Sequence, residues 1–151
     1  MLVLSAAALA AGFAVNQVND QGIPWRLLVP AFSRDRIPAR LGYLSVETMQ
    51  HLLESEGAMV WDIRPADDYR IDHIPNAESV PFIDFLRRPA RYPLPDRKDV
   101  LIVYDFEPGS PRARILGRWL VRQGLVQTRM LYPGFSGWLE AGLPVEKGGS
   151  R

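Results

Sequence analysis

Two continuous apolar runs, without alternating polar residues, constrain the fold of this chain most. One is AMVWDI at 58–63 and the other is VLIVY at 100–104. A strand with one face in water alternates apolar and polar residues, whereas a parallel strand covered on both faces is apolar throughout. The two runs therefore predict an α/β fold with a central parallel sheet flanked by helices on both faces.

Amphipathic segments around these runs predict the helices. Ser45 is a suitable N-cap for a first helix, with Val46 and Met49 on its apolar stripe and Gly57 at its end. A loop rich in Pro, Gly and Ser at 105–111 precedes a second helix at about 112–123, which completes a strand–loop–helix unit. A short strand at 128–131 and a helical turn around Trp138 are expected to close the domain.

The chain divides into four parts. Its 151 residues, 47% of them hydrophobic, suffice for one ordinary domain with its own core. We expect an apolar N-terminal segment at 1–15, an extended connector at 16–40, one globular domain at 41–146 and a flexible tail at 147–151.

The N-terminal segment is the basis for a predicted membrane association. Leu2 to Val15 carries no charge, but its 14 residues fall short of the roughly 20 that span a bilayer. The first basic residue is Arg26, which disfavours a cleaved secretory signal. A short membrane anchor is favoured over a helix docked on another protein and over a core or disordered segment. Arg26, Arg34, Arg36 and Arg40 favour a cytoplasmic domain, but the side of the membrane stays open.

Charge and composition exclude several classes of function. The 18 basic and 17 acidic residues give a net charge of +1, which argues against a nucleic-acid partner. The chain has no cysteine, which removes disulfides, thiolate zinc sites, iron–sulfur clusters and every thiol mechanism. His51 has no second ligand at metal-binding spacing, so we predict no metal and no cofactor.

Several segments between Leu44 and Val145 carry recognisable motifs. LSVETMQHLLESEGAMVWDIRPADDYRIDHIPNAESVP contains Asp-x-Arg (Asp62 and Arg64) and His-Ile-Pro-x-Ala (His73), and VLIVYD and QGLVQTRMLYPGFSGWLEAGLPV follow it. On these motifs the chain resembles the rhodanese homology domain. The first segment looks like the family's opening helix, its strand and its approach to the next strand, VLIVYD occupies the place of the active-site strand, and the last segment resembles the closing stretch. The resemblance implies a single rhodanese-like domain, in which Asp62, Arg64 and His73 have structural roles.

Position 105 departs from the family pattern. The resemblance implies that active members carry a sulfur-binding cysteine directly after the apolar strand, inside a loop of backbone N–H groups. This chain has Asp105 there, and a carboxylate cannot hold a sulfur atom as a persulfide. Cysteine-dependent sulfur transfer and phosphatase chemistry are therefore excluded, and we predict that the domain is not an enzyme. A magnesium-dependent aspartyl nucleophile is also disfavoured, because too little chain follows Asp105 to complete such a site.

Two interpretations of Asp105 stay open. We call the expected loop of backbone N–H groups the cradle. It holds two carboxylates, Asp105 and Glu107, opposed by Arg112 and Arg114. Asp105 either fills the cradle in place of a substrate anion or simply caps the following turn, and capping is the favoured interpretation. The residues expected to form a binding loop are Asp105, Phe106, Glu107, Gly109, Ser110 and Arg112.

Two further charged groups stand out. Asp62 and Arg64 are expected to form an ion-pair network with the nearby Asp67 and Asp68. Arg114, Arg118 and Arg122 recur every four residues on one helix, as a solvated basic face or as a docking face for an acidic partner or anionic lipid.

Together these features predict a non-catalytic, membrane-associated binding module with a protein partner. One alternative is an oxyanion- or sulfur-substrate-binding accessory of a sulfurtransferase or redox system. The other is a structural subunit of a membrane protein assembly.

Overall fold

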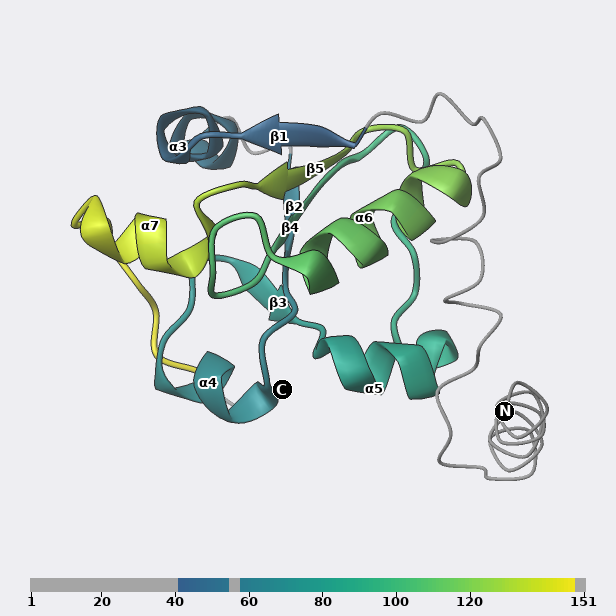
Figure 1. The fold of residues 1–151 in the computed structure, drawn as a ribbon, viewed down its shortest axis with the longest axis horizontal. Coiled ribbons are helices and arrows are strands. Elements are labelled where there is room, and N and C mark those ends of the chain that lie inside the picture. Colours follow the sequence, from purple (N-terminus) through teal and green to yellow (C-terminus); the bar gives the residue numbers. More distant parts are fainter. Residues whose placement is uncertain (1–40, 55–57, 149–151) are drawn as a thin grey trace, which may run out of the picture.

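The structure is a computed structural model that describes residues 41–54 and 58–148 (Figure 1). The predicted N-terminal segment and connector lie outside the described residues, as do 149–151. Within the described part of the chain, no helix is long and apolar enough to cross a membrane.

Five parallel strands form one sheet. Their order across the sheet is β1-β5-β4-β2-β3, and every neighbouring pair runs parallel. The strands are β1 (Gly42–Leu44), β2 (Ala58–Asp62), β3 (Ala77–Ser79), β4 (Val100–Tyr104) and β5 (Thr128–Leu131). The predicted α/β fold with a parallel sheet is confirmed.

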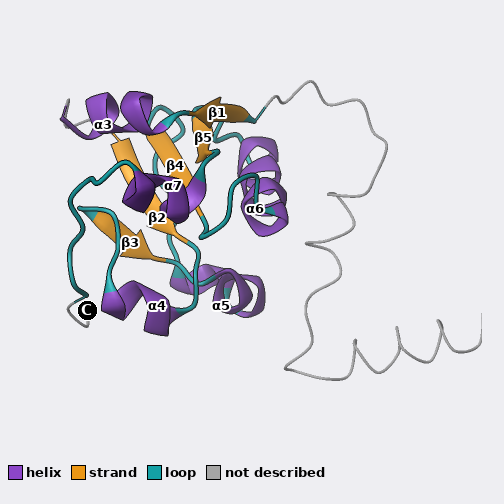
Figure 2. Ribbon diagram, turned by 60° about the vertical axis from the view of Figure 1, so that its left-hand side comes forward, coloured by secondary structure: helices purple, strands orange, loops and turns teal. Residues whose placement is uncertain are grey.

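Helices cover both faces of this sheet (Figure 2). One face carries α5 (Phe82–Arg87), the short 3-10 helix η1 (Pro89–Arg91) and α6 (Pro111–Arg122). The other face carries α3 (Val46–Glu54), α4 (Ala66–Ile71) and α7 (Gly134–Glu140).

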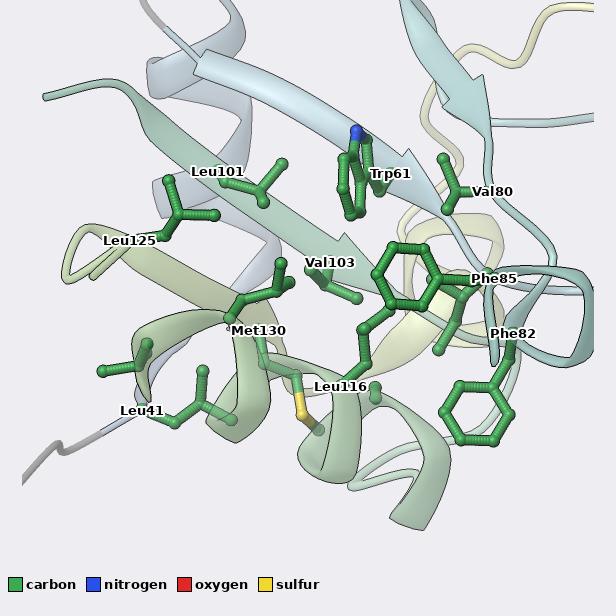
Figure 3. Packing of buried hydrophobic residues seen from close by; sticks show 14 of the residues in the cluster. Leu41, Trp61, Val80, Phe82, Phe85, Leu101, Val103, Leu116, Leu125 and Met130 are labelled. Carbon is green, nitrogen blue, oxygen red and sulfur yellow. The ribbon is translucent and has the colours of Figure 1, made fainter. Parts of the chain in front are cut away.

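Alternate residues of the central strands point into two separate cores. In β4, Leu101 and Val103 pack with α5 and α6, as Figure 3 shows for one of the two cores. Ile102 and Tyr104 point to the opposite side and pack with α3 and α7. Because both faces bury apolar side chains, the strand sequence shows no alternation.

Local details refine the expected boundaries. Ser45 does cap α3, since its Oγ accepts the N–H of Thr48 at 3.3 Å. Helix α6 begins at Pro111, and α7 makes about two turns instead of one. The Gly148 N–H donates to the Arg70 carbonyl at 3.1 Å, so contacts of the domain extend past residue 146, where we expected a flexible tail to begin.

Candidate functional site

The predicted site residues gather where two neighbouring strands end. Asp62 is the last residue of β2 and pairs in register with Tyr104, the last residue of β4. Asp105 follows immediately, so both carboxylates lie at the carboxyl edge of the sheet. In open α/β sheets this edge is where ligand sites form.

The Asp105 carboxylate is bound on several sides by its own loop. Its side chain is only 1% exposed. Arg112 donates from Nε to Oδ2 and from Nη2 to Oδ1, both at 2.8 Å, which is a bidentate pair. Ser110 Oγ donates to Oδ2 at 2.5 Å, and the Phe106 N–H donates to Oδ1 at 2.8 Å. One N–H of the following turn and three side-chain hydrogen bonds thus converge on Asp105.

The start of α7 holds the backbone of this loop. The N–H groups of Phe135 and Ser136 donate to the carbonyls of Asp105 and Phe106 at 2.8 and 3.0 Å. Gly134, at φ +68°, makes this approach possible, since a Cβ there would lie 2.5 Å from the Phe106 carbonyl oxygen. Backbone hydrogen bonds from α7 therefore help to fix the shape of the loop.

The loop separates the predicted binding residues into two groups. Ser110 and Arg112 both contact Asp105, whereas Phe106 is 47% exposed and Glu107 lies on the surface. Gly109, at φ +62°, donates its N–H to the Tyr132 carbonyl at 2.8 Å.

Arg114 does not oppose the loop carboxylates as we expected from the sequence. It is exposed and, among the described residues, pairs with no carboxylate. Arg114, Arg118 and Arg122 lie instead along α6, where Arg122 is half-buried.

A second arginine–carboxylate pair lies beside the loop and is buried. Arg64 Nη2 donates to Asp62 Oδ2 at 2.7 Å, and Arg64 Nε contacts both carboxylate oxygens at 3.1 Å. The Tyr104 hydroxyl donates to Asp62 Oδ2 at 2.7 Å and accepts the Ile74 N–H at 3.1 Å. These bonds join the ends of β2 and β4 to the segment that follows α4.

Two groups of this buried network, Arg64 and Tyr104, have shifted pKa values. Burial disfavours the charged guanidinium, but the hydrogen bonds and charge of Asp62 outweigh it, and the pKa of Arg64 is raised. Burial, together with the adjacent Asp62 carboxylate, raises the pKa of the Tyr104 hydroxyl far above its ordinary value. The guanidinium therefore stays charged and the tyrosine stays neutral at physiological pH.

The expected partners of this network were partly wrong. Asp67 forms an exposed ion pair with Arg70 instead. Asp72 takes the expected place, because its carbonyl accepts from Arg64 Nη2 at 2.6 Å and its carboxylate lies 3.6 Å from Nη1. Tyr104 was also missed, although a single hydroxyl at the end of an otherwise apolar strand is a signal for a buried hydrogen bond.

His73 is buried away from the loop. Its ring stacks on Tyr69 with centroids 3.8 Å apart, and Nδ1 lies 3.1 Å from the Tyr69 carbonyl oxygen. Its backbone forms an antiparallel bridge with Glu146. These contacts connect α4 to the end of the domain.

The site lacks the group that cysteine-dependent sulfur transfer requires. It holds no thiol, and within the described part of the chain no three metal-binding side chains come together. The main anion-binding groups of the loop, Arg112 and Ser110, are both engaged by Asp105.

Comparisons with known proteins point to one family. A family model of the rhodanese-like domain matches residues 45–141. No curated protein matches the chain. Among solved structures, a thiosulfate sulfurtransferase from Pseudomonas aeruginosa is 31% identical, with a TM-score of 0.60 over 74% of this chain and 21% of that chain.

Two more distant structures share the fold alone. A rhodanese-related protein from Thermoplasma volcanium is 19% identical, with a TM-score of 0.60 over 71% of this chain and 99% of that one. A protein from Bacillus halodurans is 23% identical, with a TM-score of 0.61 over 70% of this chain and 76% of that one.

Proposed function

Because the chain belongs to the rhodanese-like domain family and contains no cysteine, we propose that it acts as a non-catalytic binding module whose 105–112 loop recognises a protein partner. The observation that supports this proposal is that the Asp105 carboxylate occupies the anion-binding groups of the loop. Asp105 lies at the position where the family resemblance implies a sulfur-carrying cysteine, and it engages the donors that an anion would need.

This occupancy favours the binding module over an oxyanion-binding accessory. Arg112 presents its bidentate fork to Asp105, and Ser110 donates to the same carboxylate. An incoming oxyanion would have to displace a buried carboxylate from these donors and would then meet its negative charge.

Exposed aromatic residues beside the loop support a protein partner. Phe106 is 47% exposed and Tyr132 is 53% exposed, and the Gly109–Tyr132 hydrogen bond joins their two segments. Tyr43 packs edge-on against Tyr132, with ring centroids 5.8 Å apart. Exposed aromatic side chains next to a rigid loop are typical anchors of protein interfaces.

Sulfur transfer tests the catalytic half of the proposal. We expect no thiosulfate:cyanide sulfurtransferase activity from the full chain. An Asp105→Cys variant restores the thiol in the same loop and is the matched positive control; activity in this variant alone would support the assignment of position 105. Turnover by the unaltered chain would overturn the proposal.

Calorimetric titration with thiosulfate and with phosphate tests the accessory alternative. We expect no saturable binding, because Arg112 is occupied by Asp105. Saturable binding that Arg112→Ala abolishes would establish the accessory function instead.

Partner capture tests the binding surface directly. We expect Phe106→Asp to release a partner that the unaltered full chain retains. Val126→Asp is the control, because Val126 is also exposed but precedes β5 and so lies at the opposite edge of the sheet. Equal loss with both variants would argue against a loop-centred interface.

The predicted membrane association lies mainly outside the described residues. It rests on Leu2 to Val15, as does the alternative of a structural subunit in a membrane assembly. Deleting 1–16 separates them: a module keeps its loop-dependent partner, whereas a structural subunit loses its assembly.

A further inference from the structure

The helices on the two faces of the sheet carry opposite charge. Residues 82–99 and 111–124, which contain α5, η1 and α6, hold nine basic residues and three acidic ones; we call this the basic layer. Helices α3, α4 and α7 hold five acidic residues and one arginine. We propose that the basic layer is the surface with which the domain lies on an anionic lipid membrane. This inference goes beyond the loop-centred function, because the basic layer shares only residues 111 and 112 with the 105–112 loop.

Much of the positive charge in the basic layer is not neutralised. Arg114 and Arg118 are exposed along α6, and no carboxylate among the described residues pairs with them. On the neighbouring segment, Asp84 contacts Arg88 at 4.0 Å and Arg91 at 3.3 Å, so one carboxylate serves two arginines. Unpaired guanidinium groups on a convex helix surface suit lipid phosphates, which they bind by charge-assisted hydrogen bonds.

Helices α5 and α6 of the basic layer lie side by side on one face of the sheet (Figures 1 and 2). Phe85 of α5 and Trp119 of α6 make an edge-to-face contact with ring centroids 5.4 Å apart. Ile83 is exposed one turn before Arg87 on the outer side of α5. A basic surface that also exposes an apolar side chain is typical of interfacial binding.

The chain enters the domain at this same layer. Leu41, the first described residue, is buried against α6 (Figure 3). A Cβ on Gly117 of that helix would lie 2.8 Å from Leu41 Cδ1. In the sequence, the connector at 16–40 carries four arginines and two aspartates, and the uncharged Leu2–Val15 precedes it. The connector that follows the predicted membrane anchor therefore joins the domain on its basic side, which favours a lipid surface over an acidic protein.

Vesicle binding by the full chain tests this inference. Co-sedimentation is compared between neutral phosphatidylcholine vesicles and vesicles containing phosphatidylserine, so that binding by the apolar segment is measured separately. We expect preference for the anionic vesicles, and a loss of that preference in high salt, where screening shortens to about 3 Å at 1 M. Arg114→Gln/Arg118→Gln should reduce the preference about 25-fold, from about 5-fold per arginine.

The matched control removes the same charge elsewhere. Arg70→Gln/Lys147→Gln alters two exposed residues outside the basic layer and should retain most of the preference. An equal loss with both double variants would overturn the inference, because only net charge would then matter. Binding to polyglutamate without preference for anionic vesicles would also overturn it and would point to an acidic protein.

Selective labelling tests the orientation. The absence of cysteine allows one spin label at Ala90→Cys, on η1, and another at Gln50→Cys, on α3. Anionic vesicles should protect the label at 90 from a water-soluble relaxation agent and leave the label at 50 accessible. Equal accessibility would contradict the proposed orientation, whatever the outcome of the loop experiments.

Discussion

Two arginine–carboxylate pairs lie at the same edge of the sheet, and they differ in their exposure to water. Asp62 and Arg64 are both buried, with Arg64 only 3% exposed. Asp105 is equally buried, but its partner Arg112 is 46% exposed. Both pairs are bidentate, so the comparison separates the effect of solvent access from that of contact geometry.

The difference shows what each pair contributes. Arg64 Cζ lies 3.8 Å from the centre of the Phe135 ring, and its Nη2 donates a hydrogen bond to the Asp72 carbonyl. The pair therefore links β2 to α7 and to the segment after α4. Arg112 binds the Asp105 carboxylate from the solvent side of the 105–112 loop. Water can therefore replace its hydrogen bonds to Asp105. We therefore expect the buried pair to stabilise the fold, and the partly exposed pair to control whether the 105–112 loop can accept an anion.

Asp62→Asn tests the buried pair and has the largest expected effect. Removing the carboxylate charge leaves Arg64 charged and buried without its partner, which should lower the free energy of unfolding by about 3–5 kcal/mol. Urea denaturation measures this loss. Asp67→Asn, which alters an exposed pair, should cost less than about 1 kcal/mol. Equal losses would remove the distinction between buried and exposed pairs.

Arg112→Gln tests the partly exposed pair. Asp105 keeps the Ser110 hydroxyl and the Phe106 N–H, and water can reach its open side. The expected loss is therefore about 1 kcal/mol, measured by urea denaturation. Arg114→Gln on the same helix is the control and should be nearly neutral. A loss of about 3 kcal/mol or more, as expected for a buried pair, would make the two pairs equivalent.

Alkaline pH has the smallest expected effect and distinguishes the pairs by titration. The raised pKa of Tyr104 means that the folded protein keeps a proton that the unfolded chain releases. Its stabilising contribution is thus present below about pH 10 and declines as the pH rises, by about 0.4 kcal/mol at pH 10. Burial and Asp84 raise the pKa of Tyr92 to about 12, which adds a similar decline.

Denaturation at several pH values checks this prediction. Tyr104→Phe should have a shallower alkaline decline than the unaltered chain, whereas Arg112→Gln should have the same decline. An unchanged decline in Tyr104→Phe would contradict the assignment of this titration to the buried network.

The sequence predicts strongly patterned elements better than it predicts contacts. The apolar strands, the Ser45 cap and α6 follow from local patterns that a single segment contains. The short strands β1 and β3 depend on neighbours distant in the sequence, so their own residues give little signal.

Side-chain partners were harder to predict for the same reason. Arg112 and Arg114 are only two residues apart in the sequence, and the direction of the helix turns Arg112 toward Asp105 and Arg114 into solvent. Likewise, Asp67 is closer than Asp72 to Arg64 in the sequence, but the path of the chain after α4 brings the Asp72 carboxylate to Arg64. Such choices depend on three-dimensional packing.

The separation of charge across the sheet has a consequence for how the protein behaves in bulk. A net charge of +1 suggests a nearly neutral molecule, yet an approaching surface meets mainly one sign on each side. The protein should therefore be retained by both cation and anion exchangers at low ionic strength, since each resin selects the face that complements it. Its isoelectric point describes neither face.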